Sequence, residues 1–255
     1  MVTYRDPREL EIMREAGRVV ALTLAAVRDA AGPGVPLAEL DTVAARTIKE
    51  MGARPSFLHY HPTWSPTPYP ASICVSVNEV IVHGIPDGRV LREGDLVSVD
   101  CGAELRGYHG DAAVTFAVGE ADEAGRRLMD TTRLALERAI EAARPGARLG
   151  DIGHAVERTA REAGFGILEG CTGHGIGTAM HEAPDVPNVG RPGRGMVLRE
   201  GLAIAIEPMF EEGGRDDAVG LDDGWSIATA DGSRAAHFEH SIAVTADGPV
   251  ILTLP

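Results

Sequence analysis

The sequence predicts an α+β fold built from two similar halves, in which helices cover an antiparallel sheet. The first observation behind this prediction is an internal repeat, because residues 30–53 align without gaps with residues 142–165. The second is a repeated strand motif: "LREGDLVSVDCG" starts at Leu91 and "LREGLAIAIEPM" starts at Leu198. Two copies of a unit this long indicate a duplicated half-domain with pseudo-two-fold symmetry, since solenoid repeats are much shorter.

Each half contains the same elements in the same order. A segment with helical periodicity is followed by a Pro-Gly turn, a second helical segment and then strands. We expect the halves to span roughly residues 5–118 and 119–255 of a single domain, 1–255. Paired half-domains usually enclose a site between them. The residues of interest are therefore those that the repeat places at equivalent positions.

The first half contains a predicted β-hairpin. Residues 95–119, "DLVSVDCGAELRGYHGDAAVTFAVG", read as two strands joined by a type I turn with Leu105 and Arg106 at its centre and glycine after them. This register places Asp100 opposite Asp111, with Cβ atoms about 5 Å apart, where unmasked like charges repel. A slip of one residue would remove the opposition.

The second half repeats the acidic pattern. Glu207 in "LAIAIEP" occupies the place of Asp100 in "LVSVDCG", and Glu239 follows in "AHFEHSIAV". A single acidic residue is usually exposed, and a single histidine such as His174 usually packs without a ligand. Four carboxylates in apolar strands, including Asp111, are costly to bury without cations. Together they indicate a pair of divalent ions sharing bridging carboxylates; manganese, iron, cobalt and zinc all suit this ligand set.

The segment "CTGHGIGTAMHE", residues 171–182, carries His174 and His181. Its three glycines would destabilise a helix by about 1 kcal/mol each, so we expect an extended segment. The helical zinc-protease pattern is also excluded, because no histidine stands four residues after His181 and Pro184 would break the helix. The partners of His174 must therefore lie elsewhere in the chain.

Composition narrows the classes of partner. Acidic residues outnumber basic residues by 38 to 24, and the net charge of −14 disfavours nucleic acid. No charged and apolar leader and no apolar run of bilayer length are present, so we expect a cytoplasmic protein without a membrane partner. Cys74, Cys101 and Cys171 form no CxxC pair, and we expect free thiols.

These motifs resemble the type I methionine aminopeptidases, a metallopeptidase family with the pita-bread fold. The resemblance extends from "ELEIMREAGRVVA" through "VSVNEVIVHGIPD", "GDLVSVDCGAELRGYHGDAAVTF", "TGHGIGTAMHE" and "AIEPM" to "FEHSIAVT". It implies a single catalytic domain that removes the N-terminal methionine from nascent proteins and peptides whose second residue is small. It also implies a monomer whose contact with the ribosome is at most transient.

The resemblance implies five metal ligands for two divalent ions, which can be Co, Mn, Fe or Zn. Asp100 would bind one ion and His174 and Glu207 the other. Asp111 and Glu239 would bridge the two.

Three residues would have catalytic roles. His181 would hydrogen-bond the reacting carbonyl or the following amide, His83 would assist the leaving nitrogen, and Glu207 would also shuttle a proton. The implied methionine pocket is lined by Tyr69, Cys74, His83 and Trp225. Two positions depart from the usual pattern, Pro66 and Met180, where the family often has aromatic residues.

Other functions remain to be weighed. An Xaa-Pro dipeptidase is the closest enzyme alternative, but such enzymes usually carry an additional N-terminal domain, for which only residues 1–4 are spare. A binding protein that had lost its metals would be expected to lack some of the five ligands, and none is missing. The sequence contains no GxSxG motif, and "GHGIG" does not have the spacing of a dinucleotide-binding loop.

Overall fold

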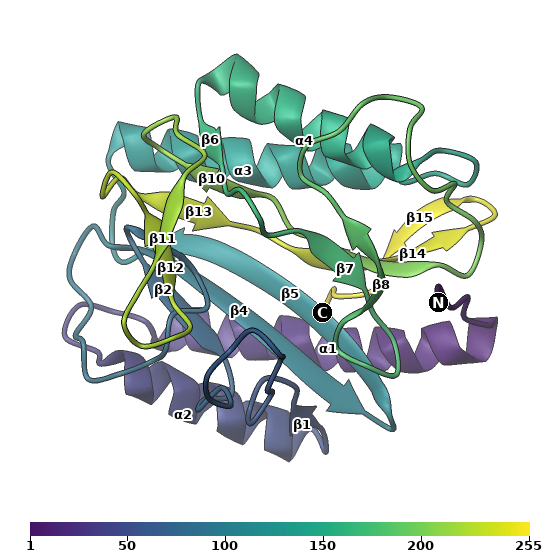
Figure 1. The fold of residues 1–255 in the computed structure, drawn as a ribbon. Helices are drawn as coiled ribbons and strands as arrows, with labels where there is room; N and C mark the ends of the chain where they lie inside the picture. Colours follow the sequence, from purple (N-terminus) through teal and green to yellow (C-terminus); the bar gives the residue numbers. More distant parts are fainter.

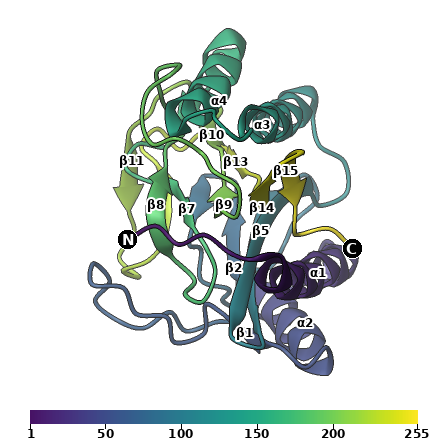
Figure 2. The ribbon, with the colours of Figure 1, turned by 90° about the vertical axis from the view of Figure 1, so that its right-hand side faces the viewer.

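Two helix pairs flank the strands in the computed structural model, which describes residues 1–255. The first pair is α1 (Pro7–Ala30) and α2 (Leu37–Glu50), and the second is α3 (Glu123–Ala142) and α4 (Leu149–Ala163). Figure 1 shows α3 and α4 above the strands and α1 and α2 below them, and Figure 2 shows the strands between the two pairs from the side. The helices α2 and α4 begin at equivalent positions of the sequence repeat.

Local sequence explains where these helices begin and end. The carboxylate of Asp6 accepts hydrogen bonds from the N–H groups of Arg8 and Glu9, and the Glu9 side chain accepts from the Asp6 N–H, which forms a capping box at the start of α1. Helix α4 ends at Gly164, whose φ of +78° is readily adopted by glycine. The apolar faces of α1 and α2 cover one core cluster, and those of α3 and α4 cover another.

The fifteen strands form four small sheets. One contains β1, β4, β2 and β5, a second β13, β10 and β6, a third β11, β12 and β3, and the fourth β15, β14, β9, β7 and β8. Every pairing is antiparallel, as the sequence predicted. The strand bounds are β1 Arg54–Pro55, β2 Cys74–Val77, β3 Val80–Val82, β4 Leu96–Leu105, β5 Tyr108–Ala117, β6 Gly166–Ile167, β7 Gly173–Gly175, β8 Glu182–Val186, β9 Ala203–Ile206, β10 Met209–Glu211, β11 Ala218–Gly220, β12 Ile227–Thr229, β13 Ala235–His237, β14 His240–Thr245 and β15 Gly248–Ile251.

The predicted hairpin forms, but its register differs from the prediction by two residues. Strand β4 pairs with β5, and Asp100 stands opposite Ala113 while Asp111 stands opposite Gly102. The physical reason is the turn, which is centred on Arg106 and Gly107 with φ values of +53° and +83°. Two left-handed residues form the tight turn whose twist matches a hairpin, whereas the predicted type I turn does not. The direct opposition of Asp100 and Asp111 was therefore wrong.

The two halves meet along a continuous backbone seam between β5 and residues 237–241. Ala113 and Glu239 exchange N–H to carbonyl hydrogen bonds at 3.4 and 2.9 Å. The Thr115 hydroxyl donates to the carbonyl of His237 and accepts from its N–H, both at 2.8 Å. The Ser241 hydroxyl likewise accepts a hydrogen bond from the N–H of Asp111 and donates one to its carbonyl. This seam fixes side chains of the second half beside those of the first.

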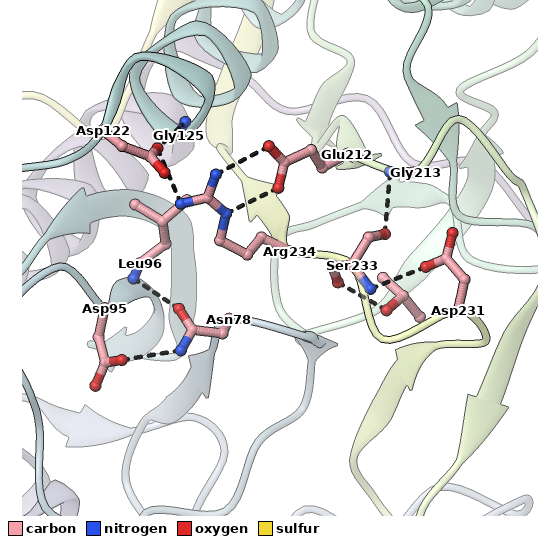
Figure 3. Close-up of polar contacts among 11 residues, drawn as sticks. Asn78, Asp95, Leu96, Asp122, Gly125, Glu212, Gly213, Asp231, Ser233 and Arg234 are labelled. Carbon is pink, nitrogen blue, oxygen red and sulfur yellow. Dashed lines mark hydrogen bonds and ion pairs between the residues drawn. The ribbon is translucent and has the colours of Figure 1, made fainter.

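A polar network on the second half anchors the strands that lead to the seam (Figure 3). The Arg234 guanidinium bonds both carboxylate oxygens of Glu212, at 2.8 and 2.9 Å, and one oxygen of Asp122 at 3.0 Å. Asp122 also accepts from the N–H of Gly125 and so caps α3. The bidentate geometry is the strongest kind of ion pair available to arginine. It fastens the start of β13 to the start of α3.

The structure also bears on the cysteines and on membrane-spanning helices. All three cysteines are free, with Cys74 and Cys101 buried. None of the helices has the length and apolar character needed to span a bilayer.

Candidate metal centre and substrate cavity

One cavity of about 500 Å³ gathers all ten residues that the sequence predicted for the site. It is lined by residues in or next to β3, β4, β5, β7 and β9 and by the loop that precedes β2. A larger cavity of about 600 Å³ between α1 and α3 shares only Glu239 with that set, so the chemistry belongs to the smaller one. The ten residues are Tyr69, Cys74, His83, Asp100, Asp111, His174, His181, Glu207, Trp225 and Glu239.

The first half contributes two carboxylates from neighbouring strands. Asp100 lies in β4 with Cys74 of β2 opposite on one side and Ala113 of β5 opposite on the other. Asp111 lies in β5, two residues from Ala113, so its side chain projects from the same face as that of Asp100. The small Ala113 side chain between them leaves the face open. The two-residue error in register therefore left both carboxylates in the same cavity, as diagonal neighbours.

The second half contributes Glu207 and Glu239, which the sequence placed within strands. The structure places both just outside strands: Glu207 follows β9, and Glu239 lies between β13 and β14. Strands β9 and β14 pair up to Ile206 and His240, and each glutamate is the next residue beyond that pair. Because the regular ladder stops there, the carboxylates turn into the cavity. The Glu207 carbonyl accepts a hydrogen bond from the Asn188 amide at 3.0 Å, which holds this irregular segment.

His174 is presented as a metal ligand requires. It lies in β7, and the segment is extended, as the sequence predicted. Its Nδ1 lies 2.9 Å from the carbonyl oxygen of Gly175, and because a carbonyl only accepts, Nδ1 carries the proton. The unprotonated Nε2 then faces the carboxylates, 3.6 Å from Asp111 Oδ2 and 3.7 Å from Glu207 Oε1.

The four carboxylates have the electrostatics of a site built around cations. Burial, followed by the charge of neighbouring carboxylates, raises the pKa values of Asp111 and Glu239 well above the ordinary range. Burial also raises the pKa of Asp100, to about 7. One oxygen each of Asp100, Asp111 and Glu239 is buried without any hydrogen-bond partner. Orphaned carboxylate oxygens beside an oriented imidazole fit divalent metal ions, and Asp111, His174 and Glu239 form one cluster of suitable donor atoms.

His181 lies beside the cluster without joining it. Its ring centroid is 4.0 Å from that of His174 and 5.1 Å from that of Tyr60, which stacks on it. Burial, and then the neighbouring imidazoles, lower its pKa to about 3. His181 is therefore neutral at pH 7, with one ring nitrogen able to donate a hydrogen bond.

Part of the cavity wall is apolar. Tyr69, Cys74 and Trp225 belong to one buried cluster, and Met180 occupies it together with Phe57 and Ala71. Tyr69 is fixed by its hydroxyl, which donates to the Gly84 carbonyl at 2.8 Å. The predicted pocket residues are thus brought together, and Met180 stands in this cluster at a position where the family resemblance leads one to expect an aromatic residue. Pro66 lies at the edge of this wall, against Gly224.

His83 lines the same cavity as the carboxylate cluster and this apolar wall. It has a left-handed backbone, with φ of +59°, directly after β3. Its Nδ1 is buried without a partner, and burial lowers its pKa to about 4. The indole of Trp64 stacks on its ring, with centroids 5.8 Å apart and planes inclined by 26°, and Trp225 meets it edge-on at 6.3 Å.

Sequence reasoning missed several residues of the site. Trp64 and Tyr60 come from the loop before β2, whose irregular Pro-rich sequence gives no periodic signal. His237 lies at the end of β13, buried beside Glu207 and Glu239, and forms a second cluster of donor atoms with them. A signal for His237 was available, because it stands two residues before Glu239 and alternate residues of an extended chain share a face.

Comparison with known proteins agrees with this geometry. The model of metallopeptidase family M24 matches residues 11–246. The chain is 51% identical to methionine aminopeptidase 1 of Mycobacterium tuberculosis, over 100% of this chain and 96% of that protein, and 45% identical to methionine aminopeptidase 1 of Bacillus subtilis, over 99% of each. It superimposes on the crystal structure of a methionine aminopeptidase from Thermotoga maritima with a TM-score of 0.95, 44% identity and full coverage of both chains.

The prolidase of Pyrococcus furiosus shares the fold at a lower level. Its TM-score is 0.78 with 22% identity, and the match covers 99% of this chain and 65% of that one. The expected pita-bread fold is therefore confirmed, and the much higher identities separate the chain from the Xaa-Pro enzymes. By sequence, fold and assembled site, the chain belongs to metallopeptidase family M24, among its methionine aminopeptidases.

Proposed function

We propose that the chain removes the N-terminal methionine from nascent proteins and peptides whose second residue is small, using two divalent metal ions. The observation that carries this proposal is one cavity that brings the carboxylate and imidazole cluster together with the apolar wall of Tyr69, Cys74 and Trp225. The chain would act as one catalytic domain, 1–255, made of two halves. We place the chain in the cytoplasm, in keeping with its three free thiols. We also expect it to act as a monomer.

The proposed ligands are the five residues predicted from the sequence. Asp100, Asp111, His174, Glu207 and Glu239 supply mostly oxygen donors, which suit Mn, Fe, Co or Zn. When bound, the ions would activate water for attack and polarise the carbonyl of the scissile bond. The orphaned carboxylate oxygens described above support this assignment, because they have no partner within the protein.

The remaining residues would bind and orient the peptide. The side chain of the N-terminal methionine would fill the wall formed by Tyr69, Cys74 and Trp225. His181, neutral because of its low pKa, would donate a hydrogen bond to the reacting carbonyl oxygen or the next amide. His83 would lie beside the leaving nitrogen, and Glu207 would move a proton between the attacking and leaving groups.

A peptide panel tests this function. Metal-free protein is supplied in turn with Mn, Fe and Co and given Met-Ala-Ser, Met-Gly-Ser, Met-Lys-Ser and an Xaa-Pro peptide, with products identified by mass spectrometry. We expect release of methionine from the first two peptides only, because a bulky second residue would collide with His83 and His181. Efficient cleavage of Met-Lys-Ser or of the Xaa-Pro peptide would overturn the methionine aminopeptidase assignment for this chain.

A further inference from the structure

A second imidazole, that of His237, lies against the carboxylate cluster. The Nε2 atom of His237 lies 3.6 Å from Glu207 Oε2 and 4.0 Å from Glu239 Oε2. These distances closely match those of His174 Nε2 to Asp111 and Glu207. Glu207 thus has one carboxylate oxygen near each imidazole.

The Nε2 atom of His237 has no hydrogen-bond partner within the protein. The residue is 1% exposed, and this atom is buried. The contacts to Glu207 and Glu239 are too long for hydrogen bonds, which require about 2.7–3.2 Å. They do fit two atoms bound to one ion, because donors about 2.1 Å from a shared metal lie roughly 3–4 Å apart.

The backbone holds this imidazole in place. Both backbone groups of His237 are bonded to the Thr115 hydroxyl at 2.8 Å. Residues 237 and 239 project to one side of the chain, while Phe238 between them packs into the core beneath α3 and α4. His237 is therefore fixed on the seam, and its Nε2 faces the carboxylates of Glu207 and Glu239.

We propose that His237 is a sixth metal ligand, which acts with Glu207 and Glu239 and gives the ion assigned to Asp100 a nitrogen donor of its own. This inference rests on the two-ion site of the proposed function and goes beyond its five ligands. Each ion would then have one imidazole, His174 for one and His237 for the other, and Glu207, which the resemblance assigns to the ion of His174 alone, would bridge the two with one oxygen near each ring. An additional imidazole favours iron, cobalt and zinc over manganese, since manganese prefers oxygen donors.

Metal binding by the full chain tests the proposal without any peptide substrate. Metal-free wild type and His237→Gln are titrated with Co²⁺ by calorimetry, and the visible spectrum of the bound Co²⁺ is recorded. We expect the variant to bind its second ion about 10- to 100-fold more weakly, with a changed spectrum. His83→Gln, which alters another imidazole of the same cavity, is the matched control and should retain both affinities. His174→Gln should weaken the other ion instead.

The outcomes separate this inference from the proposed function. If wild type binds no second ion, the dinuclear site itself fails. If wild type binds two ions and His237→Gln binds them with unchanged affinities and spectrum, only the role of His237 is refuted. Should the variant not fold, X-ray absorption of the wild type loaded with two Zn²⁺ ions decides the question. One imidazole per zinc on average supports the proposal, and one imidazole per two zinc ions refutes it.

Discussion

Metal binding should release protons, and the carboxylate cluster sets how many. In the metal-free protein, burial and the neighbouring carboxylates raise the pKa values of Asp111 and Glu239 well above their usual range, and burial raises the pKa of Asp100 to about 7. All three groups therefore hold their protons more strongly than exposed carboxyl groups do. A carboxylate must be ionised to bind a metal ion. Loading both ions should therefore release protons at pH 7, including about half a proton per chain from Asp100.

The proton count is measurable by calorimetry. The enthalpy of Co²⁺ binding is recorded at pH 7 in several buffers that differ in ionisation enthalpy. The slope of the binding enthalpy against the buffer ionisation enthalpy gives the number of protons released per chain. Glu211→Gln is the control, because Glu211 also has a pKa raised to about 7 but lies outside the cavity, so the slope should not change. A slope near zero in the wild type would show that the carboxylates are already ionised and would refute the electrostatic reasoning.

The same pKa shifts determine how the stability of the metal-free protein depends on pH. A carboxyl whose pKa is higher in the folded state than in the unfolded state binds protons on folding. Its stabilising contribution is complete below the unfolded value near 4 and is lost as the pH rises through the folded value. For Asp100 the loss should occur between about pH 4 and pH 7, and for Asp111 and Glu239 it continues at higher pH. Metal ions should remove this loss, since they favour the ionised carboxylates.

Three further predictions concern individual side chains. His181→Ala should keep both ions while kcat/KM falls about 10²-fold or more, whereas His174→Ala should also lose metal; equal metal loss in both variants would contradict their different roles. The buried carboxylate of Glu211 has no hydrogen-bond partner, and its pKa is raised to about 7. Glu211→Gln should therefore raise the free energy of unfolding, measured by urea denaturation, by up to about 3 kcal/mol at pH 8 and leave it unchanged near pH 4. Trp64 is 59% exposed, so Trp64→Ala should leave the melting temperature nearly unchanged while kcat/KM falls about tenfold. That fall should disappear in a His83→Ala background if the indole acts only by orienting His83.

The metal ligands were predictable because their chemistry conflicts with their surroundings. Asp100 and Asp111 stand in strands that are otherwise apolar, and the sequence repeat links Asp100 with Glu207. The error in the hairpin register did not matter for the site, because a shift of two residues keeps every side chain on its face. A shift of one residue would have turned one carboxylate to the opposite face. The turn itself was misjudged because Arg106 adopts a left-handed conformation, which is uncommon for a residue other than glycine.

The residues that were missed depend on contacts between distant segments. Trp64 reaches His83 and Trp225 from a loop without helical or strand periodicity, and only the folded chain shows that the three rings meet. His237 was missed for a different reason. A lone histidine in an apolar strand usually packs as a core residue, and its neighbours Glu207 and Glu239 come together only when β9 pairs with β14.

The position of the site at the seam explains why both halves must supply ligands. The backbone pair between Ala113 and Glu239 and the Ser241 bonds to Asp111 hold the bridging candidates of the two halves side by side. Those bonds place the acidic groups together whether or not ions are present, so in the metal-free protein the carboxyl groups are costly to ionise and remain buried without partners. Ions that neutralise the cluster would stabilise the contact between the halves as well as the site. The buried carboxylates therefore lower the stability of the seam in the metal-free protein. They also form a preorganised site for two ions.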